Sequence, residues 1–417
     1  MESKEFEYLF IGAGILGSSG AMALAENLTA KGKKVSIGVI DIDLSGEHSS
    51  TLKNAGGVRA TWRNRPNIEL CKYSIDFYET IKDEIQFRQL GYYWLHNEQS
   101  LAEIEKNLYL YKEYGLNVKT FMPEQIKRFL PFVDNLDGVA GLSISKSAGL
   151  IDHYSLREYY RKKAKSLGVE FLDRCYVKDV ELDNGCVKNV IAIYVKGTDN
   201  SEIIKRYLIE KEINAPHKIV PFSCDVLINT AGAWSPELSK LYGFMDYDIK
   251  PRRRQMLVIN NPEVDLSAYG MIIDTSDVYF HSEGTSILAG YSNVDEPYGY
   301  NFDVSFDTIE EDSPFVKYIW EPLWHRMSKF EKVKLIRGWA GMYGETPDRS
   351  GYIGKVAGFE NVYECAGHTG RGLMISYGAG HALADLIVDG KFRPELQSAA
   401  DFSRERPSGD LFEELHL

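Results

Sequence analysis

Residues 6–25, FEYLFIGAGILGSSGAMALA, decide the fold of this chain. The apolar run at residues 8–11 is typical of a buried strand. It leads through Gly12-Ala-Gly14-Ile15-Leu-Gly17 into small helix-forming residues. In such a turn the first glycine permits the tight bend, the second lets a pyrophosphate approach, and the third brings the helix close to the strand. Amides at the helix N-terminus favour the anion. The stretch therefore predicts a Rossmann-like dinucleotide site.

The next strand, residues 34–40, ends in Asp41. A carboxylate at this position of a dinucleotide fold accepts hydrogen bonds from the adenosine ribose. It would repel a 2′-phosphate, so the sequence disfavours NADP as the ligand.

The uncharged run at residues 8–25 could also be a signal peptide or a membrane helix. However, the residues before it are acidic on balance, and six of its members are Gly or Ser. The sequence therefore predicts no membrane span.

Composition narrows the class of protein further. The net charge of −12 argues against nucleic-acid binding. The five cysteines are scattered and form no CxxC pair, so we expect neither a metal site nor a disulfide framework. A reducing compartment, the cytoplasm, fits this cysteine usage.

Further polar or glycine-bearing stretches follow predicted strands, where the loops of a nucleotide fold face the ligand. They are residues 47–65 (EHSSTLKNAGGVRATWRNR), 225–234 (DVLINTAGAW) and 361–372. The last of them leads into a helix near 374–388. From these stretches we expect the cofactor to contact Ser49, Ser50, Asn54, Ala55, Gly56, Ala231, Gly232, Trp234, Gly370, Gly372, Leu373 and Met374.

Residues 251–260 and 277–291 are predicted to form strands of a second sheet, the latter as a hairpin around Glu283-Gly-Thr. This region carries more aromatic residues than a nucleotide fold needs, which favours a substrate-facing sheet. The sequence does not assign its inward side chains.

Six motifs, in order along the chain, carry a resemblance to a known family. They are GAGILG at Gly12, NAGGVR at Asn54, INTAGAW at Ile228, PRRRQ at Pro251, WAGMYGETPD at Trp339 and AGHTGRGLMIS at Ala366. Together they resemble the FAD-dependent amine and amino-acid oxidoreductases of the D-amino-acid oxidase superfamily, which includes glycine oxidase, sarcosine oxidase and the dye-linked L-proline dehydrogenases.

The resemblance implies an α/β fold, α+β overall, with two discontinuous domains. Residues 1–86, 150–243 and 331–400 would form a Rossmann-like FAD-binding domain. Residues 87–149 and 244–330 would form a substrate domain with a mostly antiparallel sheet, and residues 401–417 a peripheral tail.

The resemblance also implies the reaction. The α-C–H of an amine would face flavin N5, a hydride would pass to the flavin, and the imine would be hydrolysed. Gly341 stands where sarcosine oxidase has the cysteine that tethers its flavin, so FAD is expected to be non-covalent. A link through His48 is the alternative.

Four residues are implied as catalytic. Arg59 would bind the substrate carboxylate, because sarcosine oxidase has such an arginine after the same loop, and Tyr343 would lie beside the flavin. His368 and Arg371 flank the last glycine turn. Arg371 would either stabilise the reduced flavin or cap main-chain carbonyls, and both readings stay open.

Other positions are less telling. Met374 stands where sarcosine oxidase has a second carboxylate-binding residue, a lysine, which weakens a sarcosine assignment. Arg254, Gln255 and a hydrogen-bonded His281 are expected to be structural.

The expected substrate is a small amino or imino acid of the proline or N-methyl amino acid type. The alternatives are a FAD-dependent 2-hydroxy acid dehydrogenase and a non-catalytic flavoprotein that acts as an assembly factor or subunit. Oxygen, a quinone or another protein could accept the electrons.

Overall fold

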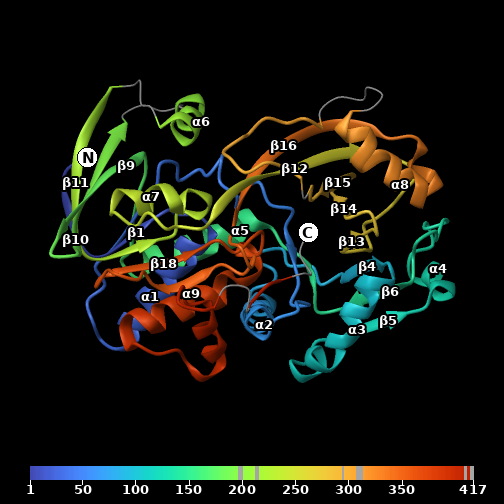
Figure 1. Cartoon of the computed structure of the whole chain (residues 1–417), viewed down its shortest axis with the longest axis horizontal. Helices are drawn as coiled ribbons and strands as arrows, with labels where there is room; N and C mark the ends of the chain where they lie inside the picture. Colours follow the sequence, from blue (N-terminus) through green and yellow to red (C-terminus); the bar gives the residue numbers. More distant parts are fainter. Residues whose placement is uncertain (196–200, 212–215, 294, 307–312, 408–410, 414–417) are drawn as a thin grey trace.

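The computed structural model describes residues 1–195, 201–211, 216–293, 295–306, 313–407 and 411–413. Two large sheets share this chain, and each collects segments that are far apart in sequence (Figure 1). One sheet is rich in parallel strands and the other is mostly antiparallel, which confirms the predicted fold class.

The first sheet is built on parallel strands in the order β18, β11, β1, β2 and β8. On β1, residues 8–11 are buried and apolar, as expected for a parallel strand that is covered on both faces. The parallel strands are β1 (Lys4–Ile11), β2 (Ile37–Ile40), β8 (Glu170–Leu172), β11 (His217–Asn229) and β18 (Val362–Ala366). The antiparallel strands β9 (Cys175–Asp183), β10 (Cys186–Val195) and β17 (Tyr352–Lys355) complete the sheet.

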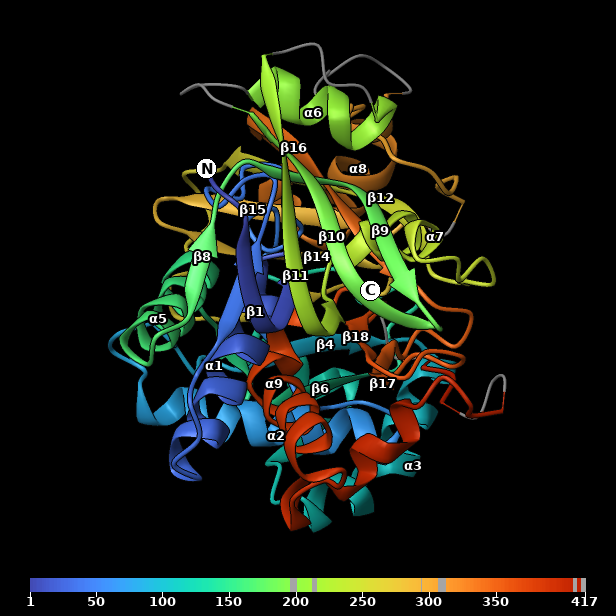
Figure 2. The ribbon, with the colours of Figure 1, turned by 90° about the vertical axis from the view of Figure 1, so that its left-hand side faces the viewer.

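Helices cover one face of the parallel strands. The β9–β10 hairpin, which continues the sheet from β11, packs with a short helix against the other face (Figure 2). Ala21 and Ala25 are fully buried on α1, so the helix lies close to its neighbours. The helices of the first face are α1 (Ile15–Ala30), α2 (Arg65–Thr80), α5 (His153–Ser166) and α9 (Gly372–Asp389), and the short helix is α7 (Ser235–Leu241).

The second sheet runs in the order β16, β12, β15, β14, β13, β4, β6 and β5, and its neighbours are antiparallel except β13 and β4. The predicted hairpin around Glu283 is β14–β15. The strands are β4 (Tyr92–His96), β5 (Val118–Phe121), β6 (Gly141–Ser145), β12 (Lys250–Asn260), β13 (Met271–Ile273), β14 (Val278–Glu283), β15 (Ser286–Tyr291) and β16 (Lys334–Glu345).

Residue alternation divides the second sheet into two faces. Tyr93 and Phe280 belong to a core that includes side chains of α4 and α8, whereas Tyr92 and Tyr279 belong to the opposite apolar cluster. The remaining elements are α3 (Glu98–Glu113), α4 (Ile126–Phe129), α6 (Ser201–Glu210), α8 (Glu321–Arg326) and the paired strands β3 (Gly57–Val58) and β7 (Gly149–Leu150).

The predicted domain boundaries stay predictions, but two observations bear on the segments near them. β16 begins just after residue 331 and pairs with β12 along its length, so it is a strand of the second sheet. Near the C-terminus, the side chains of Leu411 and Glu413 are buried.

Candidate active site

A cavity of about 620 Å³ lies along the carboxyl ends of β1, β2 and β11. Its walls come from the turn before α1, from residues 46–54, from the end of β11 and from the turn before α9. Ligands of open α/β sheets bind at this edge. The glycine-bearing stretches that the sequence singled out therefore meet in one place.

The first glycine turn is tight because two of its glycines touch other main-chain atoms. Gly12 has a φ of +103°, and a Cβ there would lie 2.5 Å from the carbonyl oxygen of Thr230. A Cβ on Gly17 would lie 1.9 Å from the carbonyl oxygen of Gly12. Hence α1 can begin at this turn only if both positions lack side chains.

Asp41 holds the same turn from the end of β2. Its Oδ2 accepts the N–H of Ala13 at 2.5 Å, and its Oδ1 accepts the N–H of Asp43 at 2.9 Å. Burial raises the pKa of the carboxyl group, while these bonds and the charge of Arg161 oppose that shift. Asp41 lines the cavity, and its contact with a ribose stays a prediction.

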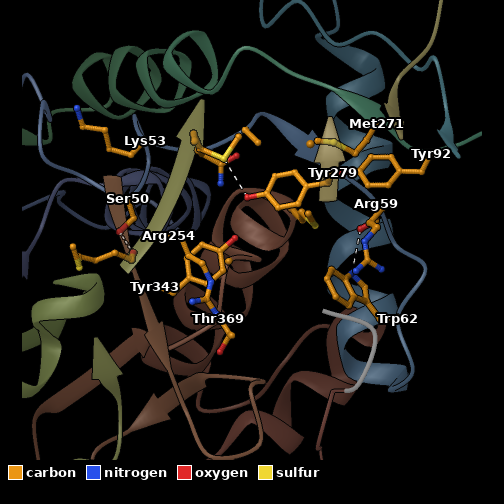
Figure 3. A pocket seen from close by; sticks show the side chains of 18 residues that line it. Ser50, Lys53, Arg59, Trp62, Tyr92, Arg254, Met271, Tyr279, Tyr343 and Thr369 are labelled. Carbon is orange, nitrogen blue, oxygen red and sulfur yellow. Dashed lines mark hydrogen bonds between the residues drawn. The ribbon is translucent and has the colours of Figure 1, made fainter. Parts of the chain in front are cut away.

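A smaller pocket of about 80 Å³ adjoins the cavity and lies against the second sheet (Figure 3). The two share Ser50, Asn54, Met342, Tyr343, Thr369 and Gly370 in their walls. Strand alternation brings Tyr92, Met256, Met271 and Tyr279 to this side of the second sheet. With Trp62, Tyr343, Met342 and Met374, the wall of the pocket contains four aromatic rings and four thioethers.

Arg59 is the cation on one side of this pocket, and it is only 1% exposed. Its guanidinium carbon lies 3.6 Å from the centroid of the Trp62 ring, and Nη1 donates to the carbonyl of Thr61. Figure 3 shows Arg59 and Trp62 together, across the pocket from Tyr343. Burial lowers the pKa of the guanidinium, which nonetheless stays charged at neutral pH.

Arg254 lies near the other side of the pocket, beside Tyr343 (Figure 3). Its Nη2 donates to Oε1 of Glu345 at 2.9 Å, and both side chains are 5% exposed. Nε of Arg252 is 3.3 Å from the other oxygen of Glu345. Arg254 therefore belongs to a buried ionic cluster as well as to the pocket wall.

His368 lies at the turn before α9, where it lines the cavity. Its Nδ1 lies 2.9 Å from the carbonyl of Ser350, so the ring donates from that nitrogen. Burial lowers the pKa of His368 to about 3, with the charge of Arg371 acting in the same direction. His368 is therefore neutral at physiological pH.

Arg371 is fully buried at the start of α9 and donates through Nη2 to the carbonyl of Arg349. Its guanidinium carbon lies 4.9 Å from the Trp62 ring centroid. Of the two readings of Arg371, a bond to a main-chain carbonyl is the contact that the structure contains. A role beside the flavin stays a prediction.

The predicted site residues sort into three groups by position. Those that line the larger cavity are Gly12, Gly14, Ile15, Asp41, Ser49, Ser50, Asn54, Ala231, Gly232, Trp234, Tyr343, His368, Gly370, Gly372 and Leu373. Those at the smaller pocket are Ala55, Arg59, Gly341 and Met374. Gly17, Gly56 and Arg371 stand behind the described walls of both.

Two histidines near the site have main-chain partners. The ring nitrogens of His281 lie 2.9 Å and 2.8 Å from the carbonyls of Ala55 and Ser282, so His281 is buried and hydrogen-bonded, as expected. Nε2 of His48 lies 3.2 Å from the carbonyl of Ser201 on α6.

Several residues of the site were missed by the sequence analysis. Trp62, Tyr92 and Tyr279 line the pocket, and the hydroxyl of Thr51 accepts the first amide of α1 at 3.0 Å. The aromatic excess of the second sheet was the available signal, but it could not show which ring faces inward.

Within the described part of the chain, His, Cys, Asp and Glu side chains form no group of three that could hold a metal ion. Among the described helices, none combines the length and apolar character needed to cross a bilayer.

Comparisons with known proteins identify relatives over almost the whole chain. The model of the family "FAD dependent oxidoreductase" matches residues 8–386. "FAD-dependent oxidoreductase domain-containing protein 1" of Xenopus laevis is 28% identical, covering 95% of this chain and 82% of its own length.

Solved structures share the fold. An L-proline dehydrogenase from P. horikoshii superposes with a TM-score of 0.78 at 22% identity, covering 96% of this chain and 97% of its own. Glycine oxidase from Geobacillus kaustophilus superposes with a TM-score of 0.74 at 16% identity, covering 97% of this chain and 99% of its own. At these identities the likeness shows the fold alone.

Proposed function

Because this chain belongs to the FAD-dependent oxidoreductase family, we propose that it oxidises the C–N bond of a small amino or imino acid, with non-covalent FAD. Proline and N-methyl amino acids are the substrates that we favour. Among proteins of the same fold, one is named L-proline dehydrogenase and another glycine oxidase, which supports this choice.

The residues of the larger cavity suit a dinucleotide cofactor. At Gly12 and Gly17 side chains would collide with the main chain, and Gly14, Ile15 and Leu16 present the start of α1 to the cavity. The helix N-terminus favours the phosphates. FAD, when bound, supplies the acceptor of the two electrons.

Non-covalent binding is supported by position 341. Gly341 has no side chain, and a Cβ there would lie 2.7 Å from Cβ of Lys53. The alternative attachment residue, His48, has its Nε2 beside Ser201 and its ring centroid 5.2 Å from that of Phe302.

One observation carries the substrate proposal: a buried arginine lies in an aromatic pocket that adjoins the cofactor cavity. The guanidinium of Arg59 would bind a carboxylate through two parallel hydrogen bonds. The rings of Tyr92 and Tyr279 would attract the ammonium group by cation–π interaction and exclude water. A volume of about 80 Å³ admits only a small substrate.

The tyrosines of the pocket act as hydrogen-bond donors. Burial raises the pKa values of Tyr92, Tyr279 and Tyr343 above their ordinary value, so their hydroxyls keep their protons at neutral pH. Hence none of them serves as the base that removes the amine proton, and the substrate must lose that proton to water or arrive without it.

A 2-hydroxy acid would present the same carboxylate to Arg59. The aromatic walls favour the amino acid instead, because a cation gains from a ring face and a neutral hydroxyl does not.

Anaerobic titration of the holoprotein tests the proposal. We expect proline or an N-methyl amino acid to bleach the flavin, while prolinamide, which lacks the carboxylate, bleaches it at far higher concentration. Bleaching by lactate alone would make the protein a hydroxy acid dehydrogenase, and bleaching by no member of the panel would indicate a non-catalytic flavoprotein.

A further inference from the structure

The last described segment, Leu411–Glu413, packs against the loop that carries Arg59 and Trp62. Glu413 is fully buried, and its N–H donates to the carbonyl of Asp348 at 3.0 Å. The carbonyl of Leu411 accepts Nδ2 of Asn64 at 3.0 Å. Hydrogen bonds therefore hold residues 411–413 against the loop that presents Arg59.

The carboxylate of Glu413 binds the main chain just after Trp62. Its Oε1 accepts the N–H of Arg63 at 3.1 Å, and its Oε2 accepts the N–H of Asn64 at 3.4 Å and Nδ2 of Asn67 at 3.1 Å. These bonds fix the start of α2 and, with it, the end of the loop that presents Arg59.

Two buried guanidiniums lie near the same carboxylate. Arg59 and Arg371 are 1% and 0% exposed, and their guanidinium carbons lie 3.6 Å and 4.9 Å from the Trp62 ring centroid. The negative charge of Glu413 acts on both and raises the pKa of each against the lowering by burial. Its carboxylate and a substrate carboxylate would thus act on the same cations.

We propose that Glu413 is a positioning residue that makes the pocket select monoanionic over dianionic carboxylates. The inference rests on the proposed function, since it assumes that Arg59 receives the substrate carboxylate. Glu413 holds residues 63 and 64 in place, and its charge lowers the positive potential at Arg59. A second negative charge on a ligand adds least to its binding free energy where the positive potential is low.

Whatever other groups surround Arg59, removing the charge of Glu413 raises the potential at the pocket, and a dianion gains more from this than a monoanion. Unit charges about 10 Å apart in a protein of effective dielectric constant about 20 give an effect of about tenfold in affinity.

The test uses the FAD-loaded protein and two ligands of nearly equal shape, succinamate with one charge and succinate with two. Dissociation constants come from perturbation of the flavin absorbance. In Glu413→Gln, we expect the ratio of succinate to succinamate affinity to rise about tenfold while FAD stays bound. Glu405→Gln makes the same change at an exposed position eight residues earlier and should leave the ratio unchanged.

The outcomes separate the two proposals. If the wild-type protein binds neither succinamate nor succinate, the carboxylate site itself is wrong and the inference falls with it. If wild type binds succinamate and Glu413→Gln leaves the ratio within twofold, or if Glu405→Gln shifts it equally, the role of Glu413 is wrong while the proposed function stands.

A second variant covers the case in which Glu413→Gln does not retain FAD. Glu413→Asp keeps the charge but withdraws the hydrogen bonds to Arg63 and Asn64. We expect both ligands to bind more weakly, with the ratio of their affinities unchanged. For an amino acid that the protein oxidises, we expect a raised KM at unchanged kcat. A changed ratio in this variant would overturn the proposal.

Discussion

The larger cavity and the smaller pocket meet along Tyr343 and Thr369, yet they are built differently. The cavity is lined by eight glycines, several of them in turns such as those at Gly12 and Gly370. The pocket is walled by side chains, among them Arg59 and Tyr279, that come from separate segments of the chain. Steric fit governs the cavity, whereas charge and ring geometry govern the pocket.

This difference separates the expected effects of substitution. A side chain added at Gly12 or Gly17, in the turn that opens the cavity, collides with main-chain carbonyl groups, so fold and cofactor should be lost together. A changed side chain in the pocket should alter substrate binding and leave the cofactor in place. Each prediction below tests one side of this contrast.

The largest effect is expected at Gly17. In Gly17→Ala the new Cβ would lie 1.9 Å from the carbonyl oxygen of Gly12, so α1 must move away from β1. We expect a loss of about 4 kcal/mol in the free energy of unfolding, together with loss of FAD. FAD content and the thermal midpoint measure both effects.

Gly372 offers the matched control for Gly17. It begins α9 as Gly17 lies near the start of α1, and it lines the cavity, but the nearest atoms to an added Cβ lie 3.9 Å away. Gly372→Ala should keep the stability of the fold, because the added Cβ meets no close protein atom and alanine is favourable in a helix. Equal losses in both variants would contradict the steric account.

The same contrast explains what the sequence could predict. Glycine turns between a strand and a helix are local, so residues close in sequence to Gly12 and Asp41 predict the dinucleotide site, and the resemblance that such motifs carry implies the fold class. Tyr92 and Tyr93 are adjacent in sequence and have identical side chains, so only the strand register decides which one faces the pocket. Glu413 lies 350 residues from Arg63, and no local pattern indicates their contact.

An intermediate effect is expected at Arg59. Arg59→Lys keeps a positive charge but removes the planar pair of donors, so a carboxylate loses one charged hydrogen bond. We expect KM for the amino acid to rise about 30-fold, equivalent to about 2 kcal/mol, with FAD content unchanged. Steady-state kinetics and flavin absorbance measure the two quantities.

Arg337→Lys is the control for Arg59→Lys, because it makes the same change on an exposed part of β16. It should leave KM unchanged. An unaltered KM in Arg59→Lys would remove Arg59 from the substrate site. Loss of FAD would show that a change in the pocket also disturbs cofactor binding in the cavity.

The smallest effect concerns His368 and the pH dependence of stability. Its pKa is about 3 in the folded protein and about 6.5 when unfolded, so the unfolded chain binds more protons between these values. The contribution of His368 is complete above pH 6.5 and declines as pH falls toward 3. Between pH 7 and 5.5 this loss is about 1 kcal/mol.

His368→Asn removes the titration of His368 from the free energy of unfolding but keeps its hydrogen bond, because the asparagine amide can still donate to the carbonyl of Ser350. The variant should lose about 1 kcal/mol less than wild type between pH 7 and 5.5, as read from denaturant unfolding at both values. His96→Asn should behave alike, since burial also lowers the pKa of His96 to about 3 and this residue lies in the second sheet.

A neutral His368 cannot titrate during turnover near pH 7, so His368→Asn should keep the pH profile of kcat. A lost ionisation near pH 7 in that profile would instead make His368 an acid–base catalyst in the wall of the larger cavity.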